Sequence, residues 1–357
     1  MDEIREDKVS SGESQNKSPI SRFNRWLRSF NNRHGDAVQK REQISQPITG
    51  IANTLEEGLR NKENPIRSPE VKGVSAILDT NEKVPVGFFE AIKEKNPDGY
   101  IVGVGVGNVF SLLNCFQEEN TPKGMVLVDV NPKVVVVGKL LVDSLKHSET
   151  PSDFSNSFFR LPTDKLQEHI REIIEREENA DLKQRLENVP QKDWEKVIGD
   201  IQGWASMDEE YARSLLEKGN YEGVVTILSK FNVLREMARL DNIAVIYSDF
   251  TNPALIDSVR DLPGFKGSRN IIYMSNIVDH ILRIRGHQAE DVSKMDSLRA
   301  YEKSSKKSIF VDTLQHSLHY FLRARYTMPT YSEQDFEFVS HRDRNKIPDG
   351  LIFPDEK

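Results

Sequence analysis

Two stretches decide the fold: Tyr100–Asn108, which reads YIVGVGVGN, and Met125–Lys133, which reads MVLVDVNPK. The first is a short apolar run that ends in closely spaced glycines, and the second is a buried-strand run that passes directly into a helix start. Asn131 is the expected N-cap of that helix, and Pro132 stands at its first position. Strand, helix, strand and helix therefore follow within roughly fifty residues, which is typical of a βαβ unit.

Further apolar runs predict the rest of the sheet. Strands are expected at 243–250 (IAVIYSDF), 270–277 (NIIYMSNI) and 308–314 (SIFVDTL). A further strand at 320–328 (YFLRARYTM) and a helix at 316–326 (HSLHYFLRARY) both fit the end of this region. Residues 150–240 carry apolar side chains at helical spacing among many charges, which predicts a helical insertion after the second strand. We therefore expect an α/β, Rossmann-like, mostly parallel sheet with flanking helices.

The N-terminal part has a different composition. Residues 1–19 are rich in Ser, Glu and Lys and have few large apolar groups, so we expect a disordered tail. Residues 20–33 (ISRFNRWLRSFNNR) predict a basic amphipathic helix, which could lie on a membrane surface or a partner protein, or more simply pack on its own domain. Residues 35–75 are polar and interrupted by prolines, as in a linker. The expected boundaries are an arm at 1–75 and a Rossmann-like domain at 76–357.

Composition excludes several classes of protein. The 357 residues include one cysteine, Cys115, so a disulfide framework and a cysteine-rich zinc site are excluded. The net charge of −7 disfavours broad nucleic-acid binding. An apolar run of about 20 residues is lacking and the N-terminus is acidic, so we expect no membrane-spanning helix, no secretory signal and a cytoplasmic location. Asp312, His316 and His319 could share a helical face, but residues without a metal are the simpler interpretation.

The glycine loop indicates a ligand. Gly103, Gly105 and Gly107 form a GxGxG pattern at the end of the first strand, where glycines allow a tight turn and close approach to the backbone. The helix that begins near Asn108 would direct N–H groups and a positive dipole end toward a carboxylate or phosphate. The dinucleotide-binding fingerprint is GxGxxG. With Gly103 and Gly105 as its first two glycines, the third would stand at position 108, which is Asn108. Glycines also serve simply to pack a helix on a strand.

Asp129 supports a nucleoside ligand. It lies at the end of the second strand, 22 positions after Gly107 (129 − 107). In such folds an acid here is adjacent to the ribose, whose hydroxyls donate to a carboxylate, and its charge would repel a 2′-phosphate. The alternative role is that of a helix cap, for which Asn131 is better placed.

In chain order, YIVGVGVGN, VLVDVNP, IYSDF and IIYMSNIVDHI resemble successive strand-end motifs of the class I S-adenosylmethionine-dependent methyltransferase superfamily. The likeness is to bacterial members of unassigned activity, and it covers roughly residues 84–146 and 240–315. It implies a Rossmann-like fold, S-adenosylmethionine as the cofactor, and transfer of a methyl group to an acceptor that the motifs do not identify.

The resemblance also assigns roles to individual residues. The glycines would wrap the methionine part of the cofactor, Asp129 would bind the ribose and Asp249 the adenine amino group. The cofactor-binding residues that it implies are Gly103, Gly105, Gly107, Asp129, Asp249, Ser275 and Asn276. Asp279 and His280 follow the fourth strand and are the candidate bases, although a salt bridge and a structural histidine are the simpler interpretation of this pair.

Two features depart from the family pattern. The acid that usually stands two residues before the first glycine, where it contacts the cofactor's amino group, is replaced by Ile101. The segment between the second and third strands is far longer than usual and could cover the carboxyl ends of the strands. A non-catalytic binding or regulatory module is therefore the second hypothesis. A nicotinamide-dependent oxidoreductase is the third, although the chain lacks a tyrosine–lysine or histidine arrangement suited to hydride transfer.

Overall fold

The structure is a computed structural model. It describes residues 50–60, 78, 87–117, 120–219, 223–275, 277, 297, 300–301, 307–314 and 317–321. All of these residues lie in one structural unit, Thr49–Lys357. The tail expected at 1–19 and the basic helix expected at 20–33 lie outside the described residues. Within the described ranges, none of the helices combines the length and the apolar character needed to cross a bilayer.

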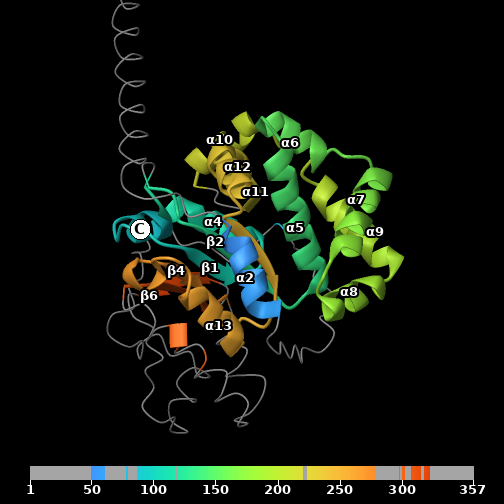
Figure 1. The fold of residues 1–357 in the computed structure, drawn as a ribbon. Helices are drawn as coiled ribbons and strands as arrows, with labels where there is room; N and C mark the ends of the chain where they lie inside the picture. Colours follow the sequence, from blue (N-terminus) through green and yellow to red (C-terminus); the bar gives the residue numbers. More distant parts are fainter. Residues whose placement is uncertain are drawn as a thin grey trace, which may run out of the picture. The chain divides into compact units, whose positions relative to one another are not determined.

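In the described part of the chain, six strands form one sheet in the order β3-β2-β1-β4-β5-β6 (Figure 1). Strands β1 to β5 are parallel, and β6 is antiparallel to β5. The strands are β1 Ile101–Val104, β2 Met125–Asp129, β3 Ile243–Tyr247, β4 Ile271–Tyr273, β5 Ile309–Leu314 and β6 Ser317–Phe321. The expected α/β fold with a mostly parallel sheet is confirmed.

Strand β6 settles the segment for which a strand and a helix were both open. Because residues 317–321 are extended, Asp312 and His319 do not share a helical face; their Cα atoms are partners across the β5–β6 ladder. The helical-face interpretation was therefore wrong for Asp312 and His319, and His316 lies outside the described residues. Among the described residues, no group of three metal-binding side chains is assembled.

Helices account for the rest of the fold, and the helical insertion expected at 150–240 is confirmed as the run α6 to α12. Side-chain caps fix several starts: Asn131 accepts the N–H of Lys133 at 3.1 Å, and Thr150 and Asp153 form a reciprocal capping box. The helices are α2 Ile51–Arg60, α3 Phe88–Lys93, α4 Gly107–Ser111, α5 Pro132–His147, α6 Pro151–Ser157, α7 Thr163–Arg176, α8 Ala180–Glu187, α9 Gln191–Gln202, α10 Glu209–Glu217, α11 Gly223–Ser229, α12 Phe231–Arg239 and α13 Pro253–Arg260, with short 3-10 helices η1 Leu112–Cys115 and η2 Phe265–Gly267.

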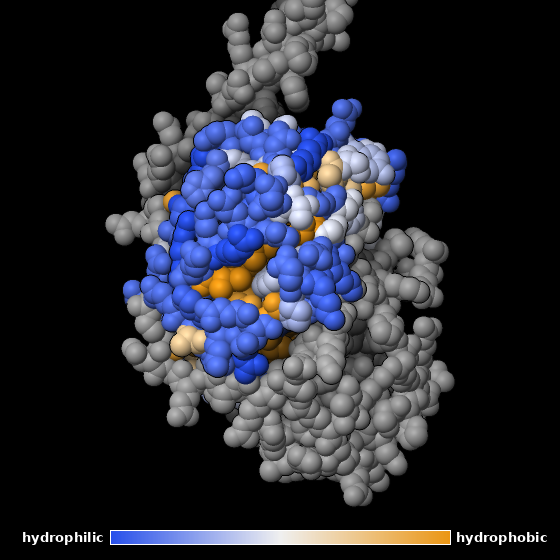
Figure 2. All heavy atoms as spheres, turned by 90° about the vertical axis from the view of Figure 1, so that its right-hand side faces the viewer, coloured by the Kyte–Doolittle hydropathy of each residue, from blue (hydrophilic) through white to orange (hydrophobic). Residues whose placement is uncertain are grey.

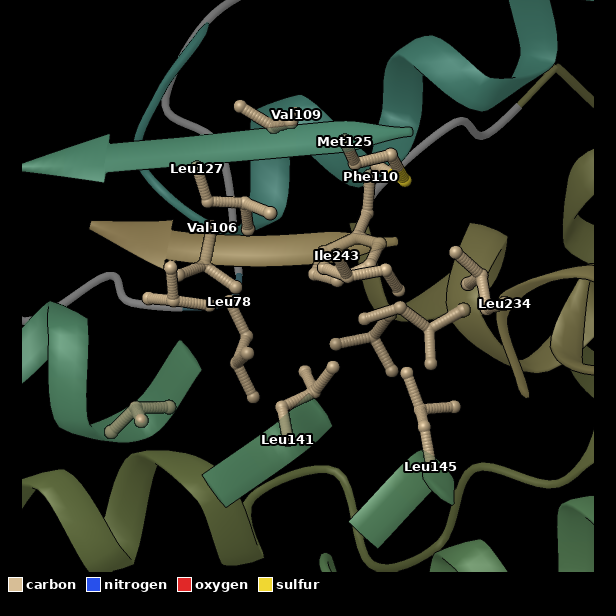
Figure 3. Close-up of a cluster of buried hydrophobic side chains, with 14 of the residues drawn as sticks. Leu78, Val106, Val109, Phe110, Met125, Leu127, Leu141, Leu145, Leu234 and Ile243 are labelled. Carbon is tan, nitrogen blue, oxygen red and sulfur yellow. The ribbon is translucent and has the colours of Figure 1, made fainter. Parts of the chain in front are cut away.

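The two faces of the sheet alternate along each strand, as the pleat requires. Met125 and Leu127 of β2 belong to a hydrophobic cluster that also holds residues of α4, α5 and the insertion, whereas Val126 and Val128 are buried outside that cluster. Figure 3 shows side chains of this cluster converging from both strands and helices; those labelled are Leu78, Val106, Val109, Phe110, Met125, Leu127, Leu141, Leu145, Leu234 and Ile243. Cys115 is fully buried in the same cluster, as its sequence context predicts.

Helix α2 corrects the expectation of a linker at 35–75. Residues 51–60 within that segment form a helix that contacts β3 and α13, and its Ile51 and Leu55 are 1% and 0% exposed. The prolines that suggested a linker lie outside this ten-residue helix. Lys139 of α5 lies 3.9 Å from Glu56 of α2 and 2.8 Å from Glu177, so the helix is also joined electrostatically to the insertion.

We predict that Leu55→Ala lowers the free energy of unfolding by about 2–4 kcal/mol, because it leaves a cavity under α2. The control is Glu57→Ala, on the exposed side of the same helix, with an expected change within about 0.5 kcal/mol. Urea denaturation followed by circular dichroism measures both. Equal, small effects would show that α2 contributes nothing to the folded core.

Candidate functional site

The predicted site residues on four neighbouring strands meet at one edge of the sheet. Gly105 follows β1, Asp129 ends β2, Asp249 follows β3 and Ser275 follows β4, and all four strands run in the same direction. The backbone joins them directly: the N–H of Gly105 donates to the carbonyl of Val128 at 3.1 Å, and that of Ser248 to the carbonyl of Asp129 at 3.1 Å. Ligands of open α/β sheets bind at this edge.

Gly105 is the glycine of the motif whose backbone conformation needs glycine. Its φ is +80°, which is unfavourable for residues with a Cβ. Among the residues that the structure describes, no atom lies within 4 Å of a Cβ built on Gly105, so these residues leave the space beside its backbone open. A ligand can therefore approach the chain closely at this turn.

Gly103 has a different role from the one that the motif predicts. It is buried inside β1, and a Cβ there would lie 2.8 Å from Cβ of Tyr273 and 3.0 Å from Cγ2 of Val109. Gly103 therefore makes room for a tyrosine of the neighbouring strand and a valine of α4. The turn with positive φ begins at Gly105, two residues after Gly103.

Gly107 packs against the insertion. A Cβ on Gly223, the first residue of α11, would lie 2.6 Å from both the Cα and the carbonyl oxygen of Gly107. Asn114, in the 3-10 helix η1 that follows α4, donates a buried hydrogen bond of 2.8 Å to the hydroxyl of Thr226 in α11. Helix α4 has five residues, and Gly107 at its start is buried, so the expectation that this helix start faces a ligand stays a prediction.

Asn108 and Tyr273 form the next contact along the loop. The Nδ2 of Asn108 donates to the hydroxyl of Tyr273 at 2.6 Å, and the tyrosine is fully buried. The side chain at position 108 thus reaches strand β4, where a dinucleotide fingerprint would have a third glycine that allows close packing of helix and strand.

Asp129 is held in a turn at the start of α5. Its Oδ1 accepts the N–H of Asn131 at 2.7 Å. Burial raises the pKa of Asp129 from 3.8 to about 6, and the backbone N–H groups of Asn131 and Val130 oppose that rise. Asp129 is thus a partly desolvated carboxylate, and it remains mostly ionised at neutral pH.

Asp249 and Ser275 also lie in tight local structure. Oδ1 of Asp249 accepts from both the N–H and the hydroxyl of Thr251, at 2.9 and 2.7 Å. Ser275, two residues after the end of β4, has a φ of +51°, an uncommon conformation for a serine. Asn276, which was predicted beside it, and the candidate bases Asp279 and His280 lie outside the described residues.

The insertion supplies charged groups at the same edge. Nζ of Lys133, in the first turn of α5, lies 3.7 Å from Oδ2 of Asp193 in α9. Tyr247, at the end of β3, has a pKa raised to about 12 by burial, with Arg185 of α8 acting in the opposite direction. The prediction that the insertion lies near the carboxyl ends of the strands agrees with these interactions.

Figure 2 shows the face of the molecule that carries α7, α8 and α9 in Figure 1. Its surface is mainly hydrophilic, and near its centre it is hollowed, with apolar residues at the bottom. Sequence reasoning did not identify Gly223 and Tyr273 as neighbours of the loop, or the pairing of Lys133 with Asp193. No local pattern marks them, because each comes from a segment distant in the sequence or has a long side chain whose direction only packing determines.

We predict that Gly223→Ala destabilises the protein by about 1–3 kcal/mol, because its methyl group would overlap the backbone of Gly107. Gly199→Ala in α9 is the matched control, since a Cβ there meets nothing within 4 Å, and alanine in a helix interior is expected to stabilise by about 0.5–1 kcal/mol. Thermal unfolding measures the difference. If both variants gained stability, the contact between α4 and α11 would not be close.

Comparison with known proteins shows the family of the chain. A comparison with the curated proteins finds no significant match. A family described as "Domain of unknown function (DUF7790)" matches residues 77–344, about three quarters of the chain. The match includes the glycine loop, the insertion and strands β1 to β6. The chain belongs to the DUF7790 family.

Proposed function

We propose that this protein binds S-adenosylmethionine at the carboxyl edge of β1 and β2 and transfers its methyl group to an acceptor. The observation that carries the proposal is the pairing of Gly105, with positive φ and open space beside its backbone, with the carboxylate of Asp129 on the adjacent strand. Strand order and the strand-end motifs agree with it.

Asp129 suits a ribose. One of its oxygens accepts the N–H of Asn131, and a carboxylate has further acceptor positions for two adjacent hydroxyls. Because its environment is partly desolvated, hydrogen bonds to this group are stronger than at an exposed carboxylate. Binding of the adenine amino group by Asp249 stays a prediction, as do the roles of Ser275 and Asn276.

The chemistry demands little from the protein beyond alignment. The sulfonium supplies an activated methyl group, which an acceptor lone pair attacks as the carbon–sulfur bond breaks and its electron pair stays on sulfur. The enzyme holds the acceptor in line and needs a base only if the acceptor must lose a proton. Asp279 and His280 stay the candidates for that base.

One observation favours a non-catalytic binding or regulatory module as the second candidate. In the methyltransferase superfamily an acid two residues before the first glycine of the loop contacts the cofactor's amino group. This chain has Ile101 two residues before Gly103, and Gly103 two residues before Gly105, so the acid is absent from both positions. Formation of S-adenosylhomocysteine in the presence of candidate amine, hydroxyl and thiol acceptors would distinguish an enzyme from such a module.

A nicotinamide-dependent oxidoreductase has less support. The dinucleotide fold continues its sheet with a parallel sixth strand, whereas β6 is antiparallel. Asn108 stands at the third glycine position and is hydrogen-bonded to Tyr273, and Gly107 is covered by Gly223.

The cytoplasmic location, and contact of residues 20–33 with a membrane or a partner protein, stay predictions.

The first test is isothermal titration of the native chain with S-adenosylmethionine, S-adenosylhomocysteine and NAD. We expect saturable binding of the two sulfur nucleosides and none of NAD. Asp129→Asn should weaken binding by about tenfold or more, since it removes a charged acceptor, and Asp129→Ala should weaken it further. Asp208→Asn is the control, because Asp208 caps α10 in an exposed position. A folded protein that binds neither sulfur nucleoside would overturn the proposal.

The pKa of Asp129 predicts a pH dependence. As pH falls from 7 to 5 the carboxyl takes up a proton around pH 6, so affinity for S-adenosylhomocysteine should fall, whereas Asp129→Asn should lack this component. For stability the sign is opposite: the folded state binds the proton more tightly than the unfolded state, so this group raises the free energy of unfolding as pH falls from about 6 to about 4. Titration calorimetry across this range checks the first effect, and urea denaturation the second. An identical pH profile in Asp129→Asn would contradict both.

A further inference from the structure

Helix α5 is capped by Asn131, and only one of the two polar side-chain atoms of this residue has a hydrogen-bond partner in the described part of the chain. Asn131 is 3% exposed, and its Oδ1 accepts the N–H of Lys133 at 3.1 Å. Its Nδ2 is buried and has no hydrogen-bond partner among the residues that the structure describes. A buried N–H without an acceptor is unfavourable and rare in folded proteins, so this group requires an explanation.

Capping of α5 explains the role of Oδ1 of Asn131, but it gives no role to Nδ2. Serine or aspartate would cap α5 about as well without an amide group. Two other asparagine caps of this chain show the usual arrangements: Nδ2 of Asn252 donates to the hydroxyl of Ser248 at 3.3 Å, and Asn179 is exposed, so water can reach it. Asn131 follows neither arrangement.

The position of Asn131 relates its amide to the candidate site. Its own N–H donates to Oδ1 of Asp129 at 2.7 Å, so the carboxylate and the amide are held by one turn between β2 and the 16-residue helix α5. On the other side of the helix start, Lys133 is paired with Asp193 at 3.7 Å. The turn therefore fixes a hydrogen-bond acceptor, the carboxylate of Asp129, two residues before a donor without a partner among the described residues, Nδ2 of Asn131.

We propose that Nδ2 of Asn131 donates a hydrogen bond to an acceptor atom of the bound nucleoside while Asp129 accepts from its hydroxyls. This inference rests on the proposed function and adds a specificity residue to it. The ligand class is a nucleoside that carries an acceptor, either the ribose ring oxygen or a purine ring nitrogen, next to a hydroxyl pair. Asn131 would distinguish such a ligand from one with a donor at that place.

The test uses a cap-preserving variant of the full chain, Asn131→Ser, titrated with S-adenosylhomocysteine. Serine keeps an oxygen to cap α5 and removes the amide donor. We expect an affinity about tenfold lower, with a Tm equal to or above that of the native chain, because a buried unpaired donor has been removed. Asn179→Ser, the same exchange at the exposed cap of α8, should leave affinity unchanged.

The outcomes separate this inference from the proposed function. Binding by the native chain that is unaltered in Asn131→Ser would overturn the inference and leave the proposed function standing. A Tm clearly below that of Asn179→Ser, whatever the affinity, would place the amide in the folding of α5 and would also overturn it. Failure of the native chain to bind S-adenosylhomocysteine would overturn the proposed function and the inference together.

Discussion

The contact between Gly107 and Gly223 is the constraint on which the rest of the arrangement depends. A Cβ at position 223 would lie 2.6 Å from the backbone of Gly107, so α11 lies too close to α4 for a side chain at this position. Residues 223–228 are all buried, and the Asn114–Thr226 hydrogen bond crosses the same contact. The insertion is therefore continuous with the core of the sheet, and it closes the start of α4.

This closure decides which part of the edge can receive a ligand. With Gly107 covered and Gly103 filled by its neighbours, open space in the loop is found beside Gly105. The adjacent strand ends in Asp129, whose pKa is raised because burial disfavours the ionised carboxylate. Partly desolvated groups of this kind are common at functional sites. The same turn fixes the buried amide of Asn131, so this amide and the carboxylate of Asp129 lie together between β2 and α5.

The strands, the insertion and the start of α5 could be predicted from the sequence because their signals are local. β-branched runs bounded by turns predict buried strands, and Asn131 followed by Pro132 predicts a helix start. Residues 51–60 were missed because a ten-residue helix with two buried side chains gives a weak pattern within a polar segment. The three glycines look equivalent in the sequence, and their roles differ because of partners far away: Tyr273, Gly223 and, at Gly105, open space. The roles of Asn276, Asp279 and His280 stay predictions, since these residues lie outside the described part of the chain.

The most direct measurement of the central claim, that a nucleoside binds at the carboxyl edge of β1 and β2, is amide hydrogen exchange with and without S-adenosylhomocysteine. The account predicts that saturating ligand slows exchange in peptides that span Gly105–Asn108 and Val128–Asn131, while peptides of the exposed side of α10 keep their rates. Saturable binding with protection confined to other segments would contradict the account, because the ligand would then occupy a different site.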